Sequence, residues 1–123
     1  MNDIIKSQKL IMTKYGENFR DCIKIVDDHV EGPEEDQILV KNIYAGVNGV
    51  YDLNMVRNKV SYIQFTPPHD LGIEAVGVII KTGRKVRDLK KGDYVSTWSI
   101  GGGYKHFQLL SREFVTKIPE ASP

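Results

Sequence analysis

The sequence contains one cysteine, one tryptophan and no long apolar run. Cys22 has no partner for an internal disulfide, which favours a reducing intracellular compartment, either the cytoplasm or an organelle such as a mitochondrion or peroxisome. No stretch approaches the ~20 apolar residues that a membrane-spanning helix requires. The first residues include Asp3 and Lys6 and lack the apolar core of a signal peptide. We therefore expect an intracellular protein without a membrane partner.

An excess of charge of one sign is also missing. Lys and Arg total 17 against 16 for Asp and Glu, which leaves a formal net charge of +1. Proteins that bind nucleic acids or anionic membranes do so through clustered cations. The composition therefore predicts no nucleic-acid partner. With 41% hydrophobic residues among 123, the chain has the size and core content of one folded domain.

Residues suited to a metal site or to catalysis are sparse. His29, His69 and His106 lie far apart, and a single cysteine excludes a four-cysteine zinc site. The spacing leaves open only a site built from His69, Glu74 and a distant ligand, and we predict no bound metal. No Gly-x-Ser-x-Gly segment indicates a hydrolase. The glycines at 101–103 lack the Lys-Ser/Thr of a phosphate-binding loop, so we predict a hairpin turn there.

Short runs of β-branched and aromatic residues, separated by turn residues, recur along the chain. Val76, Val78 and Ile80 alternate along one of these runs and are expected to share a face of a buried strand. Taken together, about seven short strands predict a mainly β fold, a closed or partly open β-barrel. The predicted strands cover residues 8–13 and 21–26, which form a hairpin, and 37–47, 72–82, 93–98, 103–110 and 114–118.

One short helix is expected after residue 48. Asn48 is a favoured N-cap residue, and Val50, Leu53 and Val56 follow it at helical spacing. Cys22 lies in an alternating apolar stretch, and we interpret it as a small core residue.

Residues 72–79 (GIEAVGVI) and 92–95 (GDYV) follow the pattern Gly-x-Glu-x-x-Gly-x-Val and then Gly-Asp-x-Val. Residues 46–54 (GVNGVYDLN) follow Gly-Val-Asn-x-x-Asp with one extra residue, and residues 103–107 (GYKHF) follow a Gly-Ser/Ala-Phe/Tyr-Ala-Glu-Tyr/Phe pattern with Lys-His in place of Ala-Glu. With these motifs the chain resembles the medium-chain dehydrogenase/reductase superfamily over residues 8–119.

The resemblance implies a domain organisation. Residues 8–118 would form the GroES-like catalytic domain, a partly open β-barrel with one short helix, and residues 1–7 an N-terminal extension. Residues 119–123 would begin a linker to a nucleotide-binding Rossmann domain that is missing from this chain. The Gly-x-Gly-x-x-Gly segment of such a domain does not occur in residues 1–123.

The resemblance also implies a branch and an activity. The zinc-dependent members carry a cysteine near the position of Asn48 and a histidine at that of Ile73, and both ligands are lost here. This places the chain with the quinone oxidoreductases and enone reductases, which include prostaglandin reductases. Such enzymes use NADPH, bound mainly by the missing domain, and no zinc. They reduce the carbon–carbon double bond of α,β-unsaturated ketones, here a 15-oxoprostaglandin-like or quinone-like small molecule.

Two further expectations follow from the resemblance. The parent protein is expected to be a homodimer, and this chain alone is expected to be inactive. The alternative function is a stand-alone GroES-like binding module, of the co-chaperonin type, without enzymatic activity.

The resemblance assigns roles to a few side chains. Asn48 would lie beside the nicotinamide and in the substrate pocket, although it also suits a helix cap. Tyr62 would be catalytic, because its phenol could donate to the enolate oxygen; its alternative role is to cover the barrel. Trp98 would line the pocket or serve as core or interface packing. Glu74 is expected to be a buried structural carboxylate.

Overall fold

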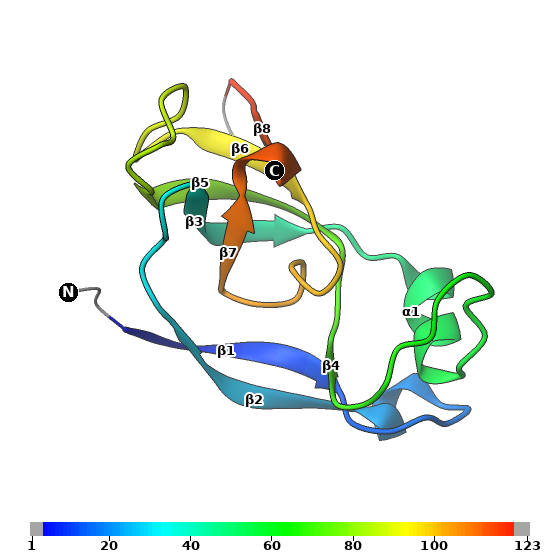
Figure 1. Ribbon diagram of the computed structural model, residues 1–123. Helices are drawn as coiled ribbons and strands as arrows, with labels where there is room; N and C mark the ends of the chain where they lie inside the picture. The colour runs from blue at the N-terminus through cyan, green and yellow to red at the C-terminus, as the bar shows by residue number, and fades with distance from the viewer. Residues whose placement is uncertain (1–3, 120–123) are drawn as a thin grey trace.

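The computed structural model describes residues 4–119, which form two antiparallel sheets with one α-helix beside them (Figure 1). In chain order the elements are β1 (Ile5–Met12), the 3-10 helix η1 (Phe19–Cys22), β2 (Ile23–Val30), β3 (Gln37–Ala45), α1 (Gly49–Val56), β4 (His69–Asp70), β5 (Glu74–Thr82), β6 (Tyr94–Trp98), β7 (Phe107–Ser111), the 3-10 helix η2 (Arg112–Phe114) and β8 (Val115–Lys117). Every pairing between these strands is antiparallel.

The larger sheet has five strands in the order β7-β3-β5-β6-β8. It curls into a half-barrel that stays open, because its two end strands are not neighbours (Figure 1). The sequence prediction of a mainly β, partly open barrel with one short helix is therefore confirmed. Apolar side chains from all five strands and from the β5–β6 connection fill its concave side: Ile38, Val40, Ile79, Leu89, Val95, Leu110 and Val115.

The alternation predicted for β5 is present, but the face that it marks is only half-buried. The buried side chains of this strand are Ala75 and Ile79, whereas Val76, Val78 and Ile80 are half-buried on the opposite face. Apolar residues occupy both faces of β5, so an alternating pattern cannot tell which face meets the core.

The smaller sheet has the order β2-β1-β4, and in Figure 1 it lies below the half-barrel. Strand β2 is the predicted partner of β1, although it begins only after η1. A second apolar cluster joins this sheet to α1, with Met12, Cys22, Met55, Val56, Phe65 and Leu71 at its centre. Cys22 is fully buried within it, which confirms the interpretation of this cysteine as a small core residue.

The predicted helix is present as α1, with Asn48 at its N-cap position. The Asn48 side chain makes no capping hydrogen bond, and its backbone carbonyl instead accepts the Asp52 N–H at 2.8 Å. Of the three apolar residues at helical spacing, Val56 is fully buried and Leu53 packs against the second apolar cluster, but Val50 is 77% exposed. Asp52 is buried as well, so α1 turns a carboxylate toward the interior.

The glycines at 101–103 form a turn, but the predicted hairpin is wrong. Strands β6 and β7 do not pair, so the 99–106 connection has to cross from one part of the sheet to the other. It crosses directly over Gly72, which has a φ of +86°. A Cβ on Gly72 would lie 2.5 Å from the Tyr104 nitrogen and 2.8 Å from the Gly103 Cα. Only a glycine allows the two backbones to approach so closely.

We predict that Gly72→Ala destabilises the protein more than Gly92→Ala does. Both glycines have a positive φ, of +86° and +93°, so each alanine carries a conformational cost of about 1–3 kcal/mol. A Cβ on Gly92 meets nothing within 4 Å, whereas one on Gly72 collides with the backbone of the 99–106 connection. Urea unfolding of both variants measures the difference. Equal losses of the free energy of unfolding would show that this crossing is not tightly packed.

Candidate functional site

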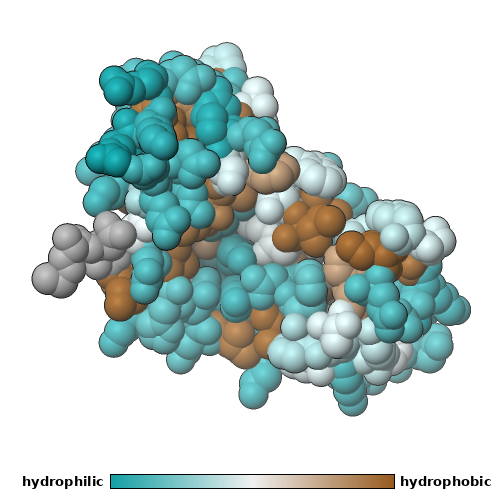
Figure 2. Space-filling view, viewed as in Figure 1, coloured by the Kyte–Doolittle hydropathy of each residue, from teal (hydrophilic) through white to brown (hydrophobic). Residues whose placement is uncertain are grey.

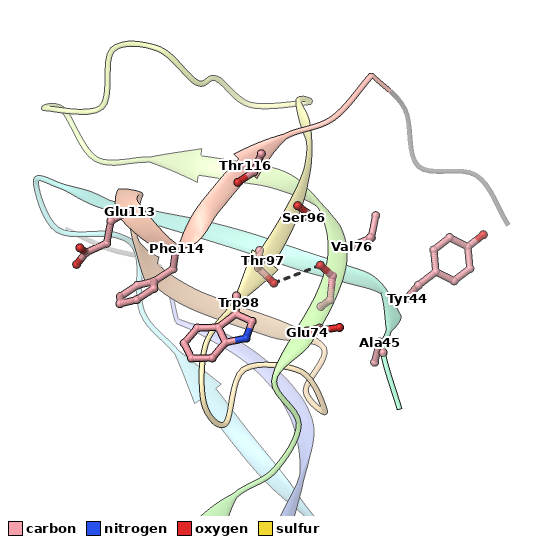
Figure 3. Close-up of a pocket in the computed structure, with 12 residues that line it drawn as sticks. Tyr44, Ala45, Glu74, Val76, Ser96, Thr97, Trp98, Glu113, Phe114 and Thr116 are labelled. Atoms are coloured by element: carbon pink, nitrogen blue, oxygen red, sulfur yellow. Dashed lines mark hydrogen bonds between the residues drawn. The ribbon is translucent and has the colours of Figure 1, made fainter. Parts of the chain in front are cut away.

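A groove of about 670 Å³ runs along the half-barrel where β3, β5, β6 and β8 lie side by side (Figure 3). Apolar and polar side chains alternate along it. Figure 3 shows the Trp98 and Phe114 rings next to each other at one end, with the Glu74 side chain beyond them. The groove is lined by Tyr44, Ala45, Gly46, Glu74, Ala75, Val76, Ser96, Thr97, Trp98, Glu113, Phe114 and Thr116.

Trp98 lies in this groove, at the end of β6 and directly opposite Glu74 of β5. Its side chain is 53% exposed, so it is not a core residue. Of the three site residues that the sequence suggested, only Trp98 lines the groove. Asn48 and Tyr62 lie outside it.

Glu74 departs from its expected role, because it is exposed rather than buried. Its backbone carbonyl accepts the Gly46 N–H at 2.9 Å. A Cβ added to Gly46 would lie 3.1 Å from the Glu74 carboxylate. Glu74 therefore lies against the segment between β3 and α1 at the rim of the groove, where solvent can reach its carboxylate.

Asn48 and Tyr62 lie at the surface, before and after α1. Asn48 is exposed, and Tyr62 is 76% exposed in the connection between α1 and β4. Burial and the nearby Tyr62 phenol raise the pKa of Tyr51 to about 12, so Tyr62 lies close to Tyr51 of α1. Tyr51 lies three residues after Asn48, which places it one helical turn farther along. The structure thus holds Tyr62 near the first turn of α1.

A buried pair that the sequence did not suggest lies beneath this helix. The Tyr104 hydroxyl donates to Asp52 Oδ2 at 2.5 Å, and Asp52 is only 4% exposed. Its other oxygen, Oδ1, is buried and has no hydrogen-bond partner among the described residues. Burial raises the pKa of Asp52, although hydrogen bonds from Tyr104 and the Asn48 backbone amide oppose the rise. Burial and the Asp52 carboxylate raise the pKa of Tyr104 to about 12.

The pair lies against a second cavity, of about 430 Å³, which is almost entirely apolar. Val47 and Gly49, the neighbours of Asn48 in the chain, also line this cavity. Its wall consists of Leu10, Phe19, Val47, Gly49, Asp52, Leu53 and Tyr104. The backbone around Asn48 therefore lies over a hydrophobic chamber that contains one buried carboxylate.

The groups that could hold a metal stay apart. Within residues 4–119 no cluster of three or more His, Cys, Asp or Glu side chains could bind a metal ion. His69 Nδ1 lies 2.6 Å from the Asp70 carbonyl and its ring packs edge-on against Phe65, so it is not directed to Glu74. Over the same residues, no helix combines the length and apolar character needed to cross a membrane.

Comparison with known proteins places these features in a family. Residues 34–120 match the family model of the alcohol dehydrogenase GroES-like domain. The chain is 32% identical over 117 residues to a probable quinone oxidoreductase of Leishmania amazonensis, covering 94% of this chain and 34% of that protein. It is 25% identical over 119 residues to prostaglandin reductase-3 of Bos taurus, covering 96% of this chain and 31% of that protein.

The fold is also that of a solved enzyme. The crystal structure of Escherichia coli quinone oxidoreductase complexed with NADPH matches with a TM-score of 0.74 and 23% identity, over 91% of this chain and 33% of that one. The chain thus spans about a third of the length of these relatives.

We predict that Asp52→Asn and Asp70→Asn change stability with pH in opposite directions. The folded state raises the pKa of Asp52, so the stability that this group contributes is complete below its ordinary value of 3.8 and is lost as the pH rises through the folded-state pKa. Asparagine does not ionise, so Asp52→Asn does not lose stability in this way. The stability of Asp52→Asn relative to wild type should therefore rise as the pH increases above 3.8.

Asp70 supplies the matched control. Burial opposes its ionisation, but Lys105 Nζ at 2.8 Å and Lys9 Nζ at 3.0 Å outweigh burial and lower the pKa of Asp70. Its contribution is present above 3.8 and is lost as the pH falls through the lower folded-state pKa. Asp70→Asn should therefore lose relative stability as the pH rises toward 3.8. Denaturant unfolding from about pH 2 to about pH 8 measures both trends, and the same slope for both variants would contradict the assignment.

Proposed function

Since the chain belongs to the alcohol dehydrogenase GroES-like domain family, within the medium-chain dehydrogenase/reductase superfamily, we propose that it is the substrate-side domain of an NADPH-dependent, zinc-independent reductase. Its substrate class is a small α,β-unsaturated ketone, quinone-like or 15-oxoprostaglandin-like. The observation that carries the proposal is the placement of two exposed polar groups, the Asn48 amide and the Tyr62 phenol, at one end of α1.

The chemistry of the reaction requires such groups. A bound nicotinamide supplies a hydride to the β-carbon of the enone, and negative charge then develops on the carbonyl oxygen. A fixed donor at that oxygen lowers the barrier, because it stabilises the charge without reorganising. Tyr62 would donate its phenol proton to the enolate oxygen, and Asn48 would orient the ring or the carbonyl. Trp98 would line the adjoining groove, whose wall includes Gly46, two residues before Asn48.

In this proposal the described residues meet the nicotinamide end of the cofactor, and its phosphates bind elsewhere. The glycine turn at 101–103 does not form a phosphate cradle, because the Gly101 N–H is bonded to the Gly72 carbonyl and the Gly102 N–H to the Ser99 carbonyl. Binding of the cofactor phosphates would have to come from residues outside 4–119.

Two other features support a zinc-independent mechanism and an intracellular location. The positions that hold zinc in the metal-dependent members carry Asn48 and Ile73, and neither side chain is a usual zinc ligand. The buried, unpaired Cys22 suits a reducing intracellular compartment.

We predict that Tyr62→Phe lowers kcat about 100-fold, as expected for the loss of one donor to the developing oxyanion, with little change in KM. The measurement is NADPH consumption by the natural gene product that contains residues 1–123, with a conjugated enone and its saturated ketone as the control substrate. Tyr94→Phe is the matched variant, since Tyr94 lies in β6 and lines neither the groove nor the second cavity, so the loss of its hydroxyl should not affect turnover.

Two outcomes would oppose the proposed function. Equal turnover by Tyr62→Phe and wild type would remove Tyr62 from the reaction. A natural gene product of 13.9 kDa that neither consumes NADPH nor reduces enones would favour the alternative, a stand-alone GroES-like binding module.

We predict that EDTA leaves the reductase activity unchanged, because the described residues provide no cluster of metal ligands. The natural gene product is dialysed against the chelator and assayed again with NADPH and an enone. Loss of activity that added zinc restores would contradict the zinc-independent mechanism.

A further inference from the structure

We propose that Asp52 and Tyr104 form a buried positioning pair that fixes the backbone of Asn48 and so sets where its side-chain amide lies. The inference rests on the proposed function for the role of Asn48, but the contacts themselves do not depend on it. Neither residue of the pair needs to touch the substrate. Both would act through Asn48.

The first step is that Tyr104 is itself held rigidly. Its carbonyl accepts the Leu10 N–H at 2.8 Å, and its own N–H donates to the Leu71 carbonyl at 3.1 Å. Its backbone lies against Gly72, where no Cβ would fit. The adjacent Lys105 Nζ forms an ion pair with Asp70 at 2.8 Å. The position of the Tyr104 ring is therefore set by β1 and by the segment that includes β4.

The second step transmits this position to α1. The Tyr104 hydroxyl reaches Asp52 Oδ2 at 2.5 Å, across 52 positions of sequence. The backbone amide of Asn48 is close enough to both groups to oppose the rise in the pKa of each. The Asn48 carbonyl accepts the Asp52 N–H at 2.8 Å. The backbone of Asn48 is thus held by the residue whose carboxyl group bonds Tyr104, while the Asn48 side chain makes no capping bond.

The third step is energetic. Asp52 is 4% exposed, and one of its carboxyl oxygens has no hydrogen-bond partner among the described residues. Burying such a group costs free energy, so it is a poor way to stabilise a helix. An apolar side chain would fill the same place beside Leu10 and Leu53 without that cost. A role in positioning Asn48 explains why a carboxyl group is buried here, because a directional hydrogen bond fixes a backbone more precisely than apolar packing does.

The experiment is nuclear magnetic resonance on the 123-residue chain, with the Asn48 backbone and side-chain amide signals as the readout. Tyr104→Phe keeps the ring and removes the hydroxyl. We expect the Asn48 signals to shift and the Asp52 backbone amide, which bonds the Asn48 carbonyl, to exchange with solvent about tenfold faster, the loss expected for one hydrogen bond. Tyr15→Phe removes an equivalent phenol bond elsewhere and should leave Asn48 unchanged.

A pH titration separates positioning from a general loss of stability. In the wild type the Asn48 amide signal should move as Asp52 ionises. Asp52→Asn should abolish that movement, and Asp70→Asn should preserve it. The proposal is overturned if Tyr104→Phe leaves the Asn48 signals unmoved, or if Tyr15→Phe moves them equally.

The kinetic test distinguishes this inference from the proposed function. In the natural gene product, Tyr104→Phe should lower kcat with KM nearly constant, whereas Tyr94→Phe, in β6, should change neither. An inactive wild-type product would end the proposed function, and the amide signals would still decide whether the pair positions Asn48.

Discussion

The close crossing of two backbones at Gly72 organises the rest of this structure. The 99–106 connection has to pass from β6 to β7, and it does so over the residue that precedes β5, at a distance that excludes a side chain. The crossing places Tyr104 between the small sheet and α1, where its hydroxyl can reach Asp52. Without that approach the half-barrel, the small sheet and the helix would share few contacts. The glycines at 72 and 103 are therefore requirements of packing, since a Cβ on either would collide with the other strand.

The same crossing explains a departure from the family pattern. Lys105 stands where the superfamily motif has alanine, and its ammonium group pairs with Asp70, which also pairs with Lys9. Asp70 is partly buried, so two cations around one carboxylate compensate for its desolvation. The substitution thus adds an electrostatic contact at the point where the 99–106 connection meets the small sheet. The neighbouring His106 is exposed and has no such role.

Local patterns predicted the elements well, because strands and helices depend on residues close in sequence. The helix after Asn48 and the hairpin of β1 and β2 followed from spacing and turn residues alone. The local patterns did not predict which side chains of each element face the interior. Val50 suited a helical stripe as well as Asp52 did, yet Asp52 is buried because Tyr104, distant in sequence, offers it a hydrogen bond. The positions of Trp98 and Glu74 opposite each other likewise depend on strand register, which a single sequence does not encode visibly.

The segment that carries Asn48 is held in place by hydrogen bonds of its backbone. The Gly46 N–H donates to the Glu74 carbonyl, and the Asn48 carbonyl accepts the Asp52 N–H. Neither anchor uses the side chain at position 48. The resemblance places a cysteine of the zinc-dependent members near this position, and a cysteine at position 48 would leave both anchors intact. The fold can therefore carry either a metal ligand or an amide at this position without a change in the loop. The backbone atoms of the residue fix where it lies, and its side chain supplies the chemistry.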